Sequence, residues 1–183
     1  VSVINMSYFH GLELSMDAGI DMSIGDFVFE FDNTTLDFNP EMIMTIYYRS
    51  LKGYDIVSAS PNRKEKFTSS LFYKVFDRFT DYSYKMTTES FRILSRRVIN
   101  RVSSMNKTIP YRKVVYANCG LKTDTLKYEV VNNIAFDEDV REKKYRSNLA
   151  ANSLLLFTDI GYRFAKFMTV FMMIVSVFMV LYS

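Results

Sequence analysis

The residues best placed for chemistry follow an apolar run near the start of the chain. The segment 27–31 (FVFEF) is typical of a buried strand, and Asp32 comes directly after it. Ligand sites of open α/β sheets lie at the carboxyl ends of their strands. A carboxylate oxygen is also the kind of ligand that a hard divalent cation prefers. Asp32 is therefore the first candidate for a cation-binding residue.

The composition limits which other chemistry is open to this chain. His10 is the only histidine and Cys119 the only cysteine. An internal disulfide is excluded, and a structural zinc site or histidine acid–base chemistry has little support. Carboxylates, hydroxyls and basic side chains must therefore carry out the chemistry. With 183 residues, 49% of them hydrophobic, the chain is long enough for one core.

Charge is distributed unevenly between the two parts of the chain. Residues 1–60 carry a net charge of −7, and residues 61–183 carry a net charge of +10. The first part suits cations and the second suits anions, although chance variation among solvated surfaces would give the same pattern. A basic second half would also suit RNA. We expect no nucleic-acid partner, because no basic stripe is interleaved with aromatic residues as in a known RNA-binding module.

The C-terminal segment predicts a membrane helix. Residues 167–182 (FMTVFMMIVSVFMVLY) contain no charge, and a helix of that length spans roughly 24 Å, a little less than the ~30 Å hydrocarbon core. Arg163 and Lys166 precede the run, and the positive-inside rule therefore places the preceding domain in the cytoplasm, at the cell membrane. A buried core helix is the alternative interpretation.

The segment just before this run is amphipathic. In residues 147–164 (SNLAANSLLLFTDIGYRF) leucine and phenylalanine share one broad face, whereas asparagine and Asp159 lie on the other. We expect a helix at the membrane interface that leads into a transmembrane helix over 165–183. An ordinary helix that packs on the domain is the alternative. Lys143, Lys144 and Arg146 would contact anionic lipid headgroups, or form a solvated charge run.

The remaining sequence predicts strands alternating with helices. Expected strands cover 1–6, 27–31, 54–59 and the end of 111–128, and expected helices cover 8–24, 40–52, 69–84, 95–104 and the start of 111–128. Segment 8–24 also shows strand-like alternation, but small residues recur there every four positions, which favours a helix. Asn39 is the expected N-cap of the helix at Pro40, and Gly53 is the expected stop. This order predicts a parallel α/β sheet.

The order of the motifs adds a family resemblance. The chain has GD at Gly25 and Asp26, an acid at the strand end, Pro-Glu at Pro40, then GYDIVSASPNR, SLFYKVF and FRILSRRVI. With its motifs in this order, the chain resembles family 2 glycosyltransferases of the polyprenyl-phosphate sugar transferase type. Enzymes of this type are similar to dolichol-phosphate mannosyltransferase. The resemblance implies an α/β fold of the GT-A (Rossmann-like) type, with a mostly parallel sheet and flanking helices. It also implies a catalytic domain over 1–146 that lacks the N-terminal nucleotide-binding strands.

The resemblance implies a metal site at Asp32. This residue matches the first acid of the DxD motif, whose carboxylate would share Mg²⁺ or Mn²⁺ with the donor's diphosphate. Thr34 stands where the family has its second acid, and Asp37 is the nearby acid that would replace it. The alternative interpretation of Asp32 is a strand-end acid that caps the next turn.

The resemblance also implies a catalytic base before the FRIL segment. Relatives carry an aspartate there, but this chain has Ser90, which is no general base at neutral pH. The neighbouring Glu89 is the candidate catalytic group. A base is unnecessary if the acceptor is already a phosphate anion. Candidate residues for binding the donor or lipid phosphate are Arg63, Arg92 and Arg96, although Arg96 is equally explained as a surface residue on a helix.

The implied function is sugar transfer at a membrane. The donor would be a UDP- or GDP-sugar, the acceptor a polyprenyl phosphate or a glycan, and the other partners membrane lipids. Open strand edges favour pairing with another chain, so a homo-oligomer is possible. The first alternative is a non-catalytic scaffold, since Thr34 and Ser90 replace two functional acids. The second is a binder of RNA or anionic lipid that uses the basic second half.

Overall fold

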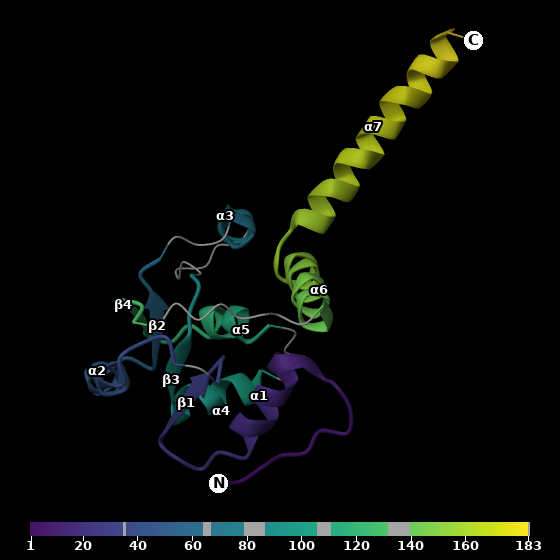
Figure 1. Ribbon diagram of the computed structural model, residues 1–183. Helices are drawn as coiled ribbons and strands as arrows, with labels where there is room; N and C mark the ends of the chain where they lie inside the picture. Colours follow the sequence, from purple (N-terminus) through teal and green to yellow (C-terminus); the bar gives the residue numbers. More distant parts are fainter. Residues whose placement is uncertain (35, 64–66, 79–86, 106–110, 132–139, 183) are drawn as a thin grey trace.

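The computed structural model describes residues 1–183 except 35, 64–66, 79–86, 106–110, 132–139 and 183. Its described residues form a four-stranded sheet with helices around it, and a long helix that leaves the domain (Figure 1). The elements are α1 (Gly11–Asp21), β1 (Phe27–Phe31), α2 (Glu41–Ser50), β2 (Ile56–Pro61), α3 (Phe67–Arg78), β3 (Phe91–Ser95), α4 (Arg96–Ser104), α5 (Arg112–Asn118), β4 (Thr123–Tyr128), α6 (Val140–Phe157) and α7 (Ile160–Tyr182).

The sheet is mixed, which corrects the prediction of a mostly parallel sheet. Its strand order is β1-β3-β2-β4, and β3 runs antiparallel to both β1 and β2, whereas β2 and β4 are parallel. The other three strands therefore share one direction, and β3 is inserted between two of them. The sequence pattern did not predict β3 as a strand. Its residues Phe91, Ile93 and Leu94 are fully buried, because the strand is central and covered on both faces.

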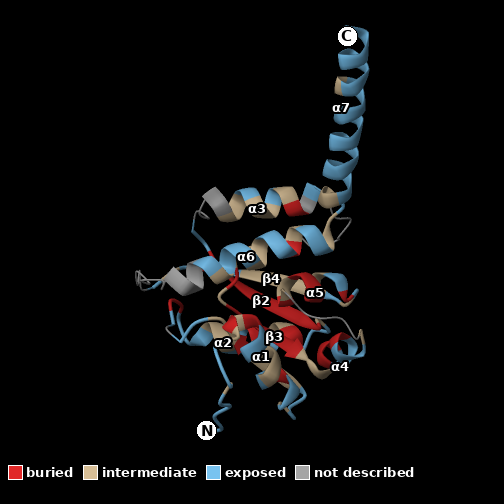
Figure 2. Cartoon of the chain, turned by 90° about the vertical axis from the view of Figure 1, so that its right-hand side faces the viewer, coloured by how far each residue is buried: buried red, intermediate tan, exposed pale blue. Residues whose placement is uncertain are grey.

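Apolar side chains fill both faces of the sheet. Ile46 of α2 packs on one face, against Val57, Phe91 and Ile93. The other face is covered by α1, α4 and α5, whose apolar side chains pack on Ile56 and Leu94 of the sheet. Figure 2 shows the central strands β2 and β3 as the most buried part of the sheet. Because helices cover both faces of the sheet, we expect a ligand to bind at the carboxyl ends of the strands.

Local signals explain most element boundaries. The Asn39 side chain accepts the backbone N–H of Glu41 at 3.2 Å, but Pro40 is the N-cap residue of α2, one position after the expected N-cap. Gly53 follows α2 with a φ of 87°, a left-handed conformation that favours glycine and stops the helix. The expected strand over 1–6 is wrong, since these residues form no regular element. The helix expected over 8–24 is shorter, because α1 covers only Gly11–Asp21. The helix expected over 69–84 begins two residues earlier, as α3, and its residues 79–84 lie outside the described residues.

The C-terminal helices divide at a different place from the one expected. The predicted interfacial helix 147–164 is split, because α6 ends at Phe157 and α7 begins at Ile160. Leu154 and Phe157 of α6 pack near Phe76 and Val114, which supports the alternative of a domain-packing helix. Leu155 and Leu156 nevertheless remain exposed. The helix α6 therefore contacts the domain with one side and leaves apolar side chains on another.

Helix α7 stands apart from the domain. Its described residues include none that is buried, and Figure 2 shows it rising away from the sheet. It is the one helix in the described part of the chain that is long and apolar enough to cross a membrane, with a mean hydropathy of 2.2. At ~1.5 Å per residue its 23 residues span ~35 Å, against a hydrocarbon core of ~30 Å. The alternative of a buried core helix does not match this exposure.

Candidate functional site

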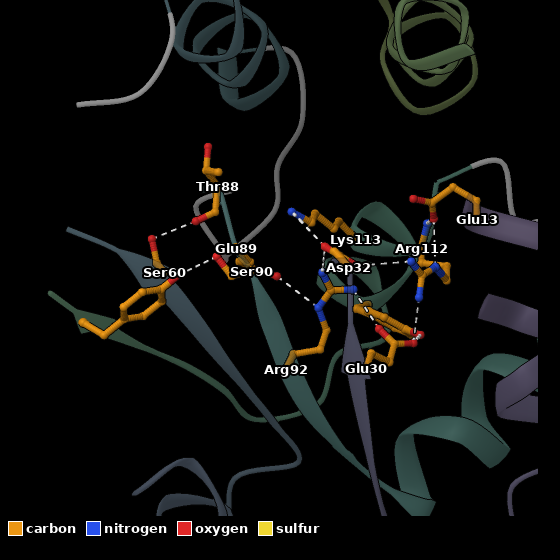
Figure 3. Close-up of polar contacts among 12 residues, drawn as sticks. Glu13, Glu30, Asp32, Ser60, Thr88, Glu89, Ser90, Arg92, Arg112 and Lys113 are labelled. Carbon is orange, nitrogen blue, oxygen red and sulfur yellow. Dashed lines mark hydrogen bonds and ion pairs between the residues drawn. The ribbon is translucent and has the colours of Figure 1, made fainter. Parts of the chain in front are cut away.

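Asp32 lies at the carboxyl end of β1, as the sequence predicts. Its backbone N–H donates to the Ser90 carbonyl at 3.1 Å, which extends the pairing of β1 with the chain before β3. Three cationic side chains reach its carboxylate (Figure 3). Arg92 lies 3.2 Å from one oxygen, Arg112 lies 3.4 Å from the other, and Lys113 Nζ lies 3.9 Å from the first. Asp32 is therefore the centre of an ion-pair cluster.

Arg92 is fully buried and holds several acids together. It sits on β3 directly opposite Glu30 of β1, so the two side chains share one face of the sheet. Its guanidinium donates to Glu30 at 2.8 Å, to Asp32, and to Glu89 at 3.1 Å. A buried arginine is tolerated only when acids surround it, and here they raise the pKa of Arg92 well above its usual value against the effect of burial. Arg92 is therefore a permanent positive charge, and it lies on the buried side of Asp32.

Arg112 reaches the same acids from the first residue of α5. Its backbone N–H and its Nε both donate to Glu13 of α1, at 2.9 and 3.0 Å. Its Nη1 lies 3.0 Å from Glu30, an ion pair whose geometry falls short of a hydrogen bond. The Tyr116 hydroxyl donates to Glu30 at 2.6 Å. The helices α1 and α5 are thus joined to β1 through charged groups.

We call these seven residues the Asp32 cluster: Glu13, Glu30, Asp32, Glu89, Arg92, Arg112 and Lys113. Burial raises the pKa of Asp32, but Arg92, Lys113 and Arg112 outweigh that effect, so the pKa lies below its usual value. Asp32 is therefore ionised at neutral pH. The side chains of Asp32 and Lys113 are 16% and 14% exposed, against 1% and 2% for Arg92 and Arg112. A ligand would meet Asp32 and Lys113 first.

The structure brings Glu89 and Arg92 into this cluster but places Asp37 elsewhere. Asp37 is buried and accepts a hydrogen bond from the Tyr128 hydroxyl at 2.7 Å. The same Tyr128 hydroxyl lies 2.5 Å from Ser90 Oγ. Burial is the largest cause that raises the pKa of Tyr128, and the neighbouring Asp37 raises it further. Asp37 therefore ends a chain of hydroxyl groups and takes no described part in the Asp32 cluster.

The two other predicted phosphate ligands lie at opposite ends of the sheet. Arg63 is exposed and follows the carboxyl end of β2, which is the same edge as Asp32. Arg96 begins α4, where its backbone N–H donates to the Asp26 carbonyl at 2.7 Å, just before β1. Its Nε donates to the Gly25 carbonyl at 2.9 Å. Because β3 runs opposite to β1, Arg96 is held at the far end from Asp32, which supports the surface interpretation.

The predicted Mg²⁺ or Mn²⁺ does not fit this arrangement. The described residues contain no group of three or more His, Cys, Asp or Glu side chains that could hold a metal ion. Both oxygens of Asp32 already face cationic groups, and Thr34 offers no carboxylate. Asp37, the proposed replacement, is engaged by Tyr128. The site therefore gives no support to a catalytic step through a metal ion.

Four members of the Asp32 cluster were not predicted from the sequence. Glu30 had a visible signal, because an acid inside the apolar run FVFEF needs a buried partner. Glu13, Arg112 and Lys113 gave no comparable signal. Glu13 and Arg112 are separated by 99 positions in the chain, and only the packing of α1 against α5 joins them.

The chain is similar to three curated bacterial proteins. It is 30% identical over 128 residues to an uncharacterized glycosyltransferase of Synechocystis sp., covering 67% of this chain and 40% of that protein. It is 24% identical over 134 residues to the uncharacterized glycosyltransferase YkcC of Bacillus subtilis, covering 70% and 41%. It is 26% identical over 159 residues to a prophage bactoprenol glucosyl transferase homolog of Escherichia coli, covering 84% and 51%. No family model matches the chain.

These matches cover more of the chain than of its relatives. The chain spans about half or less of the length of each of these proteins. All three names describe transferases, which agrees with the resemblance in the order of the motifs. Over two thirds or more of its length, this chain is a sequence relative of proteins named glycosyltransferases.

Proposed function

We propose that this chain belongs to a membrane-attached glycosyltransferase that moves a sugar from a UDP- or GDP-sugar to a polyprenyl phosphate or a glycan. Its similarity to three proteins named glycosyltransferases carries the proposal. The Asp32 cluster, at the carboxyl edge of the sheet, supports it with a site of suitable chemistry. The bactoprenol in the name of the Escherichia coli relative supports a polyprenyl acceptor.

Charged residues at this edge suit a substrate that carries phosphate. Lys113 and Arg63 both present positive charge at or near the carboxyl ends of the strands. A lysine binds phosphate as a point charge, and an arginine binds it through paired hydrogen bonds. Asp32 would orient these cations and the sugar hydroxyls, since an ionised carboxylate accepts hydrogen bonds.

Helix α7 supports the membrane part of the proposal. A polyprenyl phosphate keeps its chain in the bilayer, so an enzyme acting on it must stay close to the membrane surface. One apolar helix at the end of the domain would provide that attachment. The exposed Leu155 and Leu156 of α6 would lie at the interface. By the positive-inside rule, Arg163 and Lys166 support a cytoplasmic orientation of the domain.

Nucleotide binding tests this function directly. Calorimetric titration of UDP and GDP into the detergent-solubilised full chain should detect binding of one of them. Release of that nucleotide from a panel of nucleotide sugars should follow when acceptor lipid is added. Asp32→Ala should abolish both signals. Asp26→Ala is the matched control, because Asp26 is exposed at the opposite end of β1. The proposal fails if neither nucleotide binds and no sugar nucleotide is consumed.

A second candidate function is a non-catalytic scaffold. The observation that favours it is the loss of two functional acids of the family pattern, the second acid of the DxD motif and the base, with Thr34 and Ser90 in their places. In that case the buried ion pairs would serve the fold alone. Asp32→Ala would then leave the biological role of the protein intact in cells. A transferase would lose its role with the same substitution.

A further inference from the structure

The place beside Asp32 where a metal ion would bind is already taken by cationic side chains. Arg92 and Arg112 lie within 3.4 Å of the two carboxylate oxygens, and Lys113 Nζ lies 3.9 Å from one of them. A divalent cation bound there would be repelled by three positive charges at close range. It would gain only one carboxylate in return.

The two arginines are unable to move aside for a metal. Arg92 is also held by Glu30 and Glu89, and Arg112 is also held by Glu13 and Glu30. Both guanidinium groups are almost fully buried. Moving either one would leave buried carboxylates without their charge partner, which is strongly unfavourable. Only Lys113 is both cationic and accessible in this cluster.

The cluster as a whole contains four acids and three bases, which at first favours a cation. Its three other acids, Glu13, Glu30 and Glu89, are however buried against the arginines. They offer no oxygen to a ligand at the surface. Thr34, exposed and two residues after Asp32, adds no negative charge there. The accessible part of the cluster therefore consists of one carboxylate and one ammonium group.

We infer that this chain binds the diphosphate of its nucleotide donor without a divalent cation, and that Lys113 supplies the positive charge in its place. The inference rests on the proposed function. The contact of Lys113 with Asp32 is the longest in the cluster, so the flexible lysine is the side chain most easily drawn to a diphosphate. Asp32 then holds Lys113 close to the site through their ion pair, as a positioning residue.

Lys113 would act on the leaving group during transfer. The bond between the anomeric carbon and the diphosphate oxygen breaks, and its electron pair stays on that oxygen. An acceptor oxygen forms the new bond to the anomeric carbon. With a phosphate acceptor no proton is released. The ammonium group of Lys113 offsets the charge that develops on the nucleoside diphosphate, as preorganised cations do in other phosphate sites.

Calorimetric titration with and without metal tests the inference. UDP and GDP are titrated into the detergent-solubilised full chain in EDTA, and again in Mn²⁺ or Mg²⁺. We expect the same affinity in both conditions for the nucleotide that binds. Lys113→Met should weaken binding in EDTA by at least about tenfold, the loss expected for one charge-assisted contact. Lys122→Met is the matched control, since Lys122 precedes β4 at the opposite edge of the sheet and lies over the Tyr54 ring.

A double variant provides a positive test. Lys113→Met removes the fixed cation, and Thr34→Asp adds a carboxylate close to Asp32. Together they should produce binding that requires Mn²⁺, because one positive charge is lost and a second metal ligand is gained. Circular dichroism of each variant confirms that the fold is retained, so that a loss of binding reports on the site.

The outcomes separate this inference from the proposed function. Binding that EDTA abolishes and Mn²⁺ restores in the unchanged chain would overturn the inference and leave the transferase proposal in place. Unchanged metal-free binding in Lys113→Met would overturn the role of Lys113. Failure of both nucleotides to bind under every condition would overturn the proposed function and the inference with it.

Discussion

At the residue scale, the candidate site is built from buried charges that depend on one another. Glu30 and Arg92 face each other across β1 and β3, and both side chains are 1% exposed. Each would be very unfavourable alone in the interior, and each is stable because the other is present. Asp32 sits above this pair with only part of its carboxylate open to solvent. The accessible carboxylate of Asp32 is thus held in position by the buried ion pair of Glu30 and Arg92.

Removal of the Arg92 side chain should therefore lower the stability of the domain. We expect Arg92→Leu to lower the free energy of unfolding by about 3–5 kcal/mol, because three carboxylates lose a buried partner. Circular dichroism on chemical denaturation measures this, since the chain has no tryptophan. The control is Arg101→Leu in the exposed part of α4, which should change stability by less than about 0.5 kcal/mol. Equal effects of the two variants would contradict this account.

Asp55, at the opposite end of the sheet, should make stability depend on pH. Burial raises its pKa, but hydrogen bonds from Arg97, Ser95 and the backbone N–H of Lys122 outweigh burial and lower it. A lowered pKa in the folded state stabilises the protein above the unfolded value of about 3.9, and this contribution is lost as pH falls through the folded value.

We therefore expect Asp55→Asn to be less stable than the unchanged chain at neutral pH. The expected loss is about 1 kcal/mol, because Arg97 is largely exposed and solvent weakens its part of the interaction. The difference should shrink below about pH 4, where Asp55 becomes protonated in the unfolded chain, and it should vanish as pH falls through the lower pKa of the folded state. Denaturation curves at pH 7 and pH 3 measure both values. A difference that stays constant with pH would argue against an ionised Asp55.

At the element scale, one helix in the described part of the chain is long and apolar enough to attach the protein to a membrane. Helix α7 has a mean hydropathy of 2.2, and none of its described residues is buried. In water this helix would expose a large apolar surface, which is unfavourable. Helix α6 is different, because part of its apolar surface packs on the domain near Phe76 and Val114. The attachment should therefore depend on α7 far more than on α6.

A charge in the middle of α7 should weaken membrane insertion. An arginine at the centre of a spanning helix costs about 2.5–3.5 kcal/mol in insertion experiments. Ile174→Arg should accordingly increase the fraction of protein that alkaline carbonate extracts from membranes. The control is Met44→Arg, which places the same charge on an exposed position of α2. Retention of Ile174→Arg at the level of the unchanged chain would mean that α7 does not span the bilayer.

At the scale of the whole molecule, charge and the membrane helix together predict an orientation. The basic second half of the chain ends beside α7, with Arg163 and Lys166 in its first two turns. Positively charged flanks remain in the cytoplasm during insertion. The carboxyl edge of the sheet, with Asp32 and Lys113, would then share a compartment with nucleotide sugars.

Protease access tests this orientation. When the chain is produced in bacterial cells, the domain should resist protease added to intact spheroplasts. It should be digested once the spheroplasts are lysed, because the barrier is then the membrane and not the fold. Digestion in intact spheroplasts would place the domain outside. A variant with Arg163→Glu and Lys166→Glu should shift part of the population to that outcome.

The sequence by itself determined the features that depend on neighbouring residues. The strand 27–31, the helix that follows Pro40, the stop at Gly53 and the apolar C-terminal helix all follow from local propensity and hydrophobic pattern. Asp32 was also found in this way, since a strand end is a local feature. The similarity to glycosyltransferases agrees with the resemblance in the order of the motifs.

Only the tertiary structure decided the contacts between distant segments. Strand β3 lies antiparallel between β1 and β2. No local pattern specifies this position, because strand pairing depends on burial across the whole sheet. The tertiary structure also joined Glu13 to Arg112 and brought Lys113 to Asp32, while it placed Asp37 and Arg96 away from that cluster. The reason is physical: a buried charge is stable only beside its partner, and packing determines where that partner lies.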